Sequence, residues 1–179
     1  MQLSVRLFIW LSLTLLLALE HAWAQGGAQP SEYQIKAAFL FNFIKLTEWP
    51  PQANTSPIVI GILGNNPFGD VLERTIHDKT IDNRGLVIKE FKTAQEATNC
   101  HVLFIGTSEK VRLPEIFKAL SAASVLTIGE SDSFVEDGGI IGFYTDGTKV
   151  RFQINDQAAR QAGLKISAKL VVLATRPAR

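Results

Sequence analysis

The sequence predicts an α/β domain. We expect a three-layer sandwich whose mostly parallel sheet has helices on both faces and an antiparallel hairpin at one edge. Short β-branched runs alternate with helical segments along most of the chain, and this alternation is typical of parallel sheets covered by helices. Near the C-terminus, Asp146-Gly147 separates two apolar runs. Asp-Gly at such a position indicates a hairpin.

The N-terminal segment, residues 1–24, predicts a cleaved secretory signal peptide. Arg6 precedes an apolar stretch, and Ala22-Trp23-Ala24 forms a small-residue cleavage pattern. The apolar stretch is short for a membrane span. An uncleaved N-terminal anchor is the alternative, which Glu20 and His21 disfavour because they interrupt the apolar run. Residues 25–30 are then a flexible lead-in and residues 31–175 a single domain of an exported protein.

The elements of the domain follow in chain order. Ser31 and Gln34 have the spacing of a capping box, which predicts a helix that begins there and ends before Pro50-Pro51. Composition then predicts strands at 58–63, 86–91, 101–106 and 124–129, helices at about 70–77 and 108–123, a hairpin of 139–145 with 149–155, and a helix at 157–165. Residues 167–174 fit either a helix or a strand.

The first predicted helix has two apolar stripes, although a surface helix needs only one. Leu40 and Ile44 lie in one stripe, and Phe39 and Phe43 lie in a second stripe roughly opposite. One interpretation is that the helix is buried between the sheet and the C-terminal segment. The other is that the second stripe contacts another protein or another copy of the chain. The aromatic residues also alternate as in a strand, but the length and the capping box favour a helix.

No pattern of catalytic or metal-binding residues is present, so we expect neither an enzyme nor a cofactor. His77 and His101 are far apart and have no metal-ligand spacing. Cys100 is the only cysteine, which excludes an internal disulfide, and the apolar run that follows it favours burial. A net charge of +1 without a basic patch argues against a nucleic-acid partner.

A small-molecule binding domain is the alternative interpretation. Open α/β sheets bind ligands at the carboxyl ends of their strands, and the turn GNNPFG follows the strand at 58–63. Its candidate ligand residues are Asn65, Asn66 and Asp70, together with Arg151, whose guanidinium suits a carboxylate. The turn matches neither a dinucleotide-binding fingerprint nor a P-loop.

Two residues at the end of the hairpin also have structural interpretations. Arg151 is expected to pair with an acidic residue of the loop at 130–138. Asn155 is expected to cap the helix that follows it.

Five segments in order resemble the YfiR family, small periplasmic proteins of Gram-negative bacteria: YQIKAAFLFNFIKLTEWP, IGILGNNPFG, CHVLFIG, LTIGESDSFVEDGGIIGFY and VRFQINDQAARQAGLKISAKLVVLA. The similarity runs from about Tyr33 to Ala174. This resemblance implies no catalysis. The best-known member binds the periplasmic region of a membrane diguanylate cyclase and represses it, which lowers cyclic-di-GMP production and biofilm formation.

The resemblance also implies partners and candidate residues. In that family an outer-membrane lipoprotein titrates the repressor away, and members form homodimers. Phe39, Phe43 and Trp49 belong to the characteristic first block and become candidate partner-binding residues. The well-known repressor has paired cysteines linked to redox control, whereas this chain has Cys100 alone. Disulfide-dependent regulation is therefore not carried over.

Overall fold

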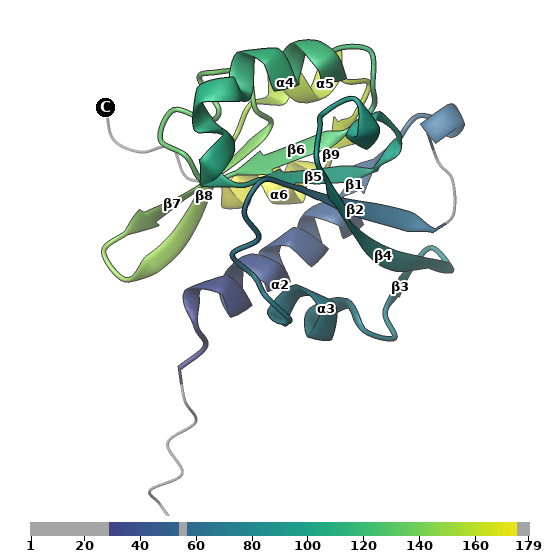
Figure 1. Ribbon diagram of the computed structural model, residues 1–179. Helices are drawn as coiled ribbons and strands as arrows, with labels where there is room; N and C mark the ends of the chain where they lie inside the picture. Colours follow the sequence, from purple (N-terminus) through teal and green to yellow (C-terminus); the bar gives the residue numbers. More distant parts are fainter. Residues whose placement is uncertain (1–28, 54–56, 175–179) are drawn as a thin grey trace, which may run out of the picture. The chain divides into compact units, whose positions relative to one another are not determined.

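A computed structural model of the protein describes residues 29–53 and 57–174 (Figure 1). The predicted signal peptide at 1–24 lies outside the described residues, as does most of the lead-in. The described residues form a mixed α/β domain with a curled, mostly parallel sheet. Within them, no helix combines the length and apolar character that a bilayer span requires.

The larger sheet has seven strands in the order β3-β4-β2-β5-β6-β7-β8. The strands are β2 (Ile58–Leu63), β3 (Thr80–Ile81), β4 (Arg84–Phe91), β5 (Val102–Ile105), β6 (Leu126–Gly129), β7 (Ile141–Asp146) and β8 (Lys149–Ile154). The neighbouring pairs from β4 to β7 are parallel, whereas β3 and β8 run antiparallel to β4 and β7. Gly147, with φ 59°, lies in the turn between β7 and β8. A separate antiparallel pair consists of β1 (Thr47–Glu48) and β9 (Lys165–Ile166).

The helices confirm most of the sequence-based elements. They are α2 (Glu32–Lys45), α3 (Val71–Ile76), α4 (Leu113–Leu120), α5 (Asp156–Gln161) and α6 (Ala168–Leu173), with short 3-10 turns at Pro51–Ala53, Glu96–Asn99 and Thr107–Arg112. The single helix expected at 108–123 is instead a 3-10 turn followed by α4, which has a proline in its first turn. Residues 167–174 contain the helix α6, whose start is capped by the Ser167 side chain.

The capping box at the start of α2 is confirmed. The Ser31 hydroxyl accepts a hydrogen bond from the Gln34 backbone N–H at 3.3 Å, and the Gln34 side chain accepts one from the Ser31 N–H at 2.6 Å. These bonds satisfy N–H groups that have no partner within the helix. The helix therefore begins at Glu32, as its sequence predicts.

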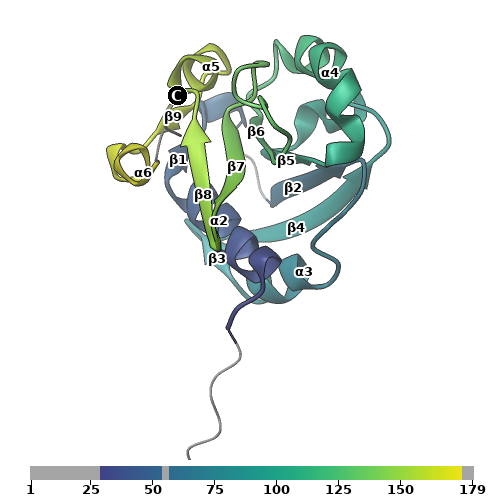
Figure 2. The same ribbon diagram turned by 90° about the vertical axis from the view of Figure 1, so that its left-hand side faces the viewer.

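Apolar side chains are buried on both faces of the curled sheet. Seen in Figure 2, the strands from β4 to β8 follow an arc, with α2 inside the arc and α4 outside it. In β5, Val102 and Phe104 pack on the side of α2, whereas Leu103 and Ile105 pack on the side of α4. Successive strand residues point to opposite faces, so a strand covered on both sides is apolar throughout.

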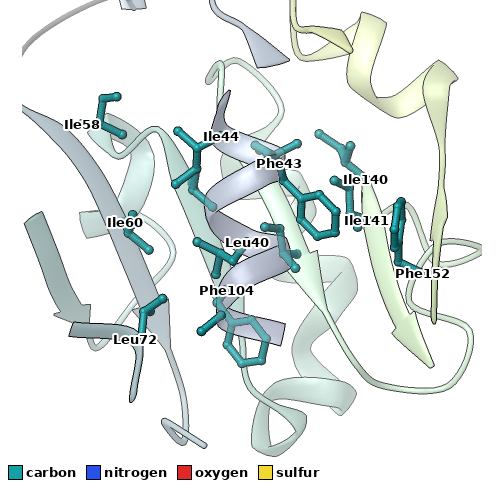
Figure 3. Close-up of a cluster of buried hydrophobic side chains, with 14 of the residues drawn as sticks. Leu40, Phe43, Ile44, Ile58, Ile60, Leu72, Phe104, Ile140, Ile141 and Phe152 are labelled. Atoms are coloured by element: carbon teal, nitrogen blue, oxygen red, sulfur yellow. The ribbon is translucent and has the colours of Figure 1, made fainter. Parts of the chain in front are cut away.

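The position of α2 inside the arc explains its two apolar stripes. In Figure 3, Ile44 points toward Ile58 and Ile60 of β2, while Phe43 points toward Ile141 and Phe152 of the β7–β8 pair. The curl therefore brings sheet residues against two sides of the same helix.

Candidate functional site

The second stripe of α2 lies against β7 and β8. Phe43 is fully buried, and its ring centroid is 5.6 Å from that of Phe143 and 4.8 Å from that of Phe152. Phe39 is half-buried, 5.3 Å from Phe152 and 6.0 Å from Phe43. Phe43 is thus a core residue with no accessible surface for a partner in this structure, and Phe39 has only part of its ring exposed.

Trp49 connects the segment after α2 to the start of β5. Its indole N–H donates to the His101 carbonyl oxygen at 3.2 Å, and the two rings meet edge to face at 5.9 Å. His101 is itself buried, and its Nδ1 accepts a hydrogen bond from the Val59 N–H at 3.1 Å. The half-buried indole therefore has a structural contact on one side and an exposed part on the other.

At the crevice expected near the turn at 64–70, the turn after β2 packs against the turn after β5. The β2 and β5 ends meet where the strand order reverses, which is the usual ligand position in such sheets. There the Asn65 amide oxygen accepts from the Ser108 N–H at 3.2 Å, and the Ser108 hydroxyl accepts from the Asn65 N–H at 3.0 Å. A Cβ atom added to Gly64 would lie 2.5 Å from the Ser108 hydroxyl. The two turns therefore close against each other.

Asn66 and Asp70 have partners within the same region. The Asn66 amide N–H donates to the Glu90 carboxylate at 3.2 Å. Asp70 is exposed and forms an ion pair with Arg74 one helical turn later. Asn66 lines a groove of about 840 Å³ beside β4, and neither Asn65 nor Asp70 lines that groove.

Arg151 lies on β8, four strands from β2 in the sheet order, so the four candidate ligand residues do not converge. Its Nε lies 3.9 Å from Asp146, across the β7–β8 turn. The predicted pairing of Arg151 with the loop at 130–138 is wrong, because Arg151 pairs instead with Asp146 of the neighbouring strand β7. The prediction for Asn155 is confirmed, since its side chain accepts a hydrogen bond from the first turn of α5.

A buried charge cluster centred on Lys36 has no signal in the sequence. Lys36 is only 4% exposed, and its ammonium contacts Glu130 and, at 2.5 Å, Glu32. The Tyr33 hydroxyl donates to the Glu130 carboxylate at 3.2 Å. Lys36 and Glu130 are 94 residues apart, and only the fold brings them together.

The cluster changes the pKa of two of its members. Burial favours the neutral form of Lys36, but its bonds to the Glu130 and Glu32 carboxylates outweigh burial and raise its pKa above 10.5. Burial and the negative charge of Glu130 raise the pKa of Tyr33 above 10.0. The adjoining cleft of about 700 Å³ lies beside the carboxyl ends of β5 and β6. Because Lys36 is on α2 and Glu130 follows β6, their ion pair holds α2 against the loop after β6.

The described residues offer little for metal or thiol chemistry. Across residues 29–53 and 57–174, no three His, Cys, Asp or Glu side chains are grouped so that they could hold a metal ion. Cys100 is buried as predicted, and burial raises the pKa of its thiol to about 12. The thiol therefore stays protonated at physiological pH and is a poor nucleophile.

An exposed apolar surface, the α6 patch, lies at the end of the described chain. It consists of Val171, Val172 and Leu173, which are 43%, 83% and 62% exposed. Leu170, which precedes these three residues on the same helix, is buried in the core. Among the described residues the other large hydrophobic side chain of comparable exposure is Val111, at 91%.

A groove of about 530 Å³ continues from the α6 patch. It lies between α6 and β8 and is lined by Val171 and Val172 together with Ile154 and Ile166. The sequence did not indicate this surface, because residues 167–174 fit a helix and a strand equally well.

Comparison with known proteins agrees with this fold. A crystal structure titled "conserved domain protein from Vibrio cholerae O1 biovar El Tor str. N16961" matches with a TM-score of 0.58 and 16% sequence identity. The match covers 81% of this chain and 60% of that chain, which supports the fold alone. A family profile described as YfiR/HmsC-like matches residues 33–175. This match confirms the resemblance seen in the five sequence segments, and the chain belongs to the YfiR/HmsC-like family.

Proposed function

We propose that the protein is a periplasmic, non-catalytic regulator. It binds the periplasmic region of a membrane diguanylate cyclase and represses it, which lowers cyclic-di-GMP signalling and biofilm formation. Family membership supports this role. The observation that carries the proposal is the α6 patch, because a regulator that acts by protein contact needs an accessible apolar surface.

Within the described residues, most of the surface of the α6 patch is uncovered and can be buried by a partner. Burying one valine or leucine side chain stabilises a complex by roughly 1.5–3 kcal/mol before the costs of association. Val172 and Leu173 are mostly exposed, so the larger part of that free energy is available to a partner. The Ser167 cap and buried Leu170 hold the helix in place, so little ordering is required on binding.

The three candidate partner-binding residues, Phe39, Phe43 and Trp49, have different roles in this proposal. Phe43 is excluded from the contact surface because it is fully buried. The exposed parts of Phe39 and Trp49 remain candidate contacts at the edge of an interface. We also propose that the protein forms a homodimer and that an outer-membrane lipoprotein is a further partner.

The test measures binding of the mature protein to the purified periplasmic region of the cyclase by calorimetry. Val172→Asp places a charge in the α6 patch and should weaken binding at least about tenfold, since a buried unpaired charge is costly. Val111→Asp is the matched control, because Val111 is a similarly exposed valine on the 3-10 turn before α4. Equal affinity of both variants would show that the α6 patch is not the binding surface for the cyclase. Failure of the unchanged protein to bind would reject the cyclase as its partner.

A further inference from the structure

One edge of the large sheet is open. The strand β4 pairs with β2 along Leu86–Phe91 on one side. On the other side β3 pairs only with Arg84 and Gly85. Among the described strands, none pairs with the outer edge of β4 from Leu86 to Phe91. Every second residue of this stretch directs its backbone N–H and C=O outward, which makes the edge a template for a further strand.

The pairing of β3 with β4 is limited to two residues because the turn before β3 directs the backbone away from β4. Asp78 has a φ of 56°, in the left-handed region. The Lys79 N–H donates to the Ile76 carbonyl oxygen at 3.0 Å, so the backbone before Thr80 turns back toward α3. Residues 77–79 therefore do not continue the pairing of β3 along β4.

A groove of about 840 Å³ runs along the open edge. Leu86, Val87 and Ile88 are consecutive residues of β4 and all line it. Successive side chains point to opposite faces, so a cavity lined by three consecutive residues includes backbone of the strand, and its further lining by Thr80 and Gly85 extends it to the outer edge of β4. Leu72 and Ile76 of α3 form the opposite, apolar wall.

The charges in this groove are mainly negative. Glu73 and Glu90 line it, and Glu73 has no ion-pair partner among the described residues. The basic groups nearby are already in contact with other side chains. Lys79 lies over the Phe41 ring at 4.6 Å, and the imidazole of His77 contacts Asp78 at 2.9 Å. The groove is thus complementary to an apolar segment that carries a basic residue.

We propose that this groove binds an extended segment of a partner protein, which adds to β4 as a further strand. Its backbone pairs with the open edge, and its alternate side chains enter the groove. Apolar residues lie opposite Leu86 and Ile88, and a lysine or arginine lies opposite Glu90. This site is separate from the α6 patch and does not depend on the identity of the cyclase.

A second copy of the chain fits this edge less well than a basic segment. Two β4 edges related by a two-fold axis pair antiparallel, with residues of the same face opposite each other. Centring the pairing on residue 89 or 90 places Lys89 or Glu90 opposite its own copy, and like charges directly opposite each other destabilise a strand pair. Centring it on residue 88 places Glu90 opposite Leu86 and Lys89 opposite Val87, so Glu90 has no basic residue opposite it, whereas a basic segment supplies one.

The probes are two synthetic seven-residue peptides, SKTVTVS for antiparallel addition to β4 and SVTVTKS for parallel addition. In either orientation the lysine lies opposite Glu90, and the two valines lie opposite Leu86 and Ile88. Each peptide is compared with a version in which glutamate replaces lysine and with a version whose backbone amides are N-methylated. Fluorescence anisotropy measures binding to the mature protein. Amide hydrogen exchange measures protection of residues 86–91.

The proposal predicts that one lysine peptide binds and slows exchange at alternate amides between Leu86 and Phe91, while the N-methylated form does not. In Glu90→Lys the lysine peptide should bind about fivefold more weakly and the glutamate peptide more tightly. Glu115→Lys, an equivalent charge change on α4, should leave both affinities unchanged. The proposal would be overturned if the peptides bound without protecting the amides of β4, or if Glu90→Lys left both affinities unchanged. It would also be overturned if neither lysine peptide bound.

Discussion

The helices α2 and α6 are both rich in apolar residues, yet the fold uses them in opposite ways. The arc of the sheet surrounds α2, and Phe43 of its second stripe is fully buried. In contrast, α6 has Leu170 in the core but leaves Val172 and Leu173 mostly exposed. The apolar residues of α2 therefore serve mainly folding, whereas α6 leaves most of the surface of Val172 and Leu173 accessible.

This difference shows why an apolar stripe alone does not identify an interface. In a flat sheet the second stripe of α2 would face away from the strands. Curling places β8 beside the helix, where Phe152 meets both Phe39 and Phe43. The decisive information is thus the curvature of the sheet, which is not contained in the composition of the helix.

The largest effect is expected from removing the buried stripe of α2. Phe43→Ala should lower the free energy of unfolding by about 3–5 kcal/mol, because it deletes a fully buried ring and leaves a cavity. Phe39→Ala should cost clearly less, since that ring is half-buried. Urea unfolding followed by circular dichroism measures both. If Phe43→Ala were as stable as the unchanged protein, α2 would not be a core helix.

A smaller loss is expected from the polar side of the same helix. Lys36→Met removes the ammonium and leaves the Glu130 side chain, which is only 10% exposed, without its ion pair. Removing one partner of a buried pair costs roughly 3 kcal/mol, of which the hydrogen bond from Tyr33 offsets a part. Lys45→Met, an exposed position on the same helix, is the control and should change little. Equal stability of the two variants would show that the cluster does not hold α2.

The same cluster predicts a dependence on pH. The pKa values of Lys36 and Tyr33 are both raised in the folded protein, above 10.5 and 10.0 respectively. A group with a raised folded pKa contributes stability below its unfolded pKa and loses it as the pH rises through the folded pKa. Stability should therefore decline above about pH 10. A double variant, Lys36→Met with Tyr33→Phe, should decline less steeply in urea unfolding between pH 9 and 11.

The smallest effect on folding is expected at the α6 patch. Val172→Ala should change the free energy of unfolding by less than about 0.5 kcal/mol, because the side chain is already 83% exposed. The same urea measurement checks this expectation. A loss comparable with that of Phe43→Ala would mean that α6 is covered in the isolated protein.

Local signals in the sequence predicted much of the fold. The Ser31 and Gln34 spacing located the start of α2, and Asn155 located the start of α5. The strands were recognisable because parallel strands buried on both faces are apolar throughout, as in β5. Residues 167–174 stayed ambiguous because a short apolar run, here the five residues 170–174, suits either a helix or a strand.

The candidate sites were harder to predict because they depend on contacts between distant residues. Asn65 was correctly placed after β2, but its hydrogen bonds to Ser108 depend on the turn after β5. The pairing of Lys36 with Glu130 likewise requires the loop after β6 to reach α2. Charge and polarity along the chain give no information about which loops meet.

The most direct test of this account compares amide hydrogen exchange in the mature protein with and without the bound cyclase region. The account predicts that exchange slows in α6, residues 168–173, and stays unchanged in α2, whose second stripe is already covered. The protection should be lost with Val172→Asp. A complex that forms while α6 exchanges at its original rate would contradict the central claim that α6, and not α2, is the contact surface.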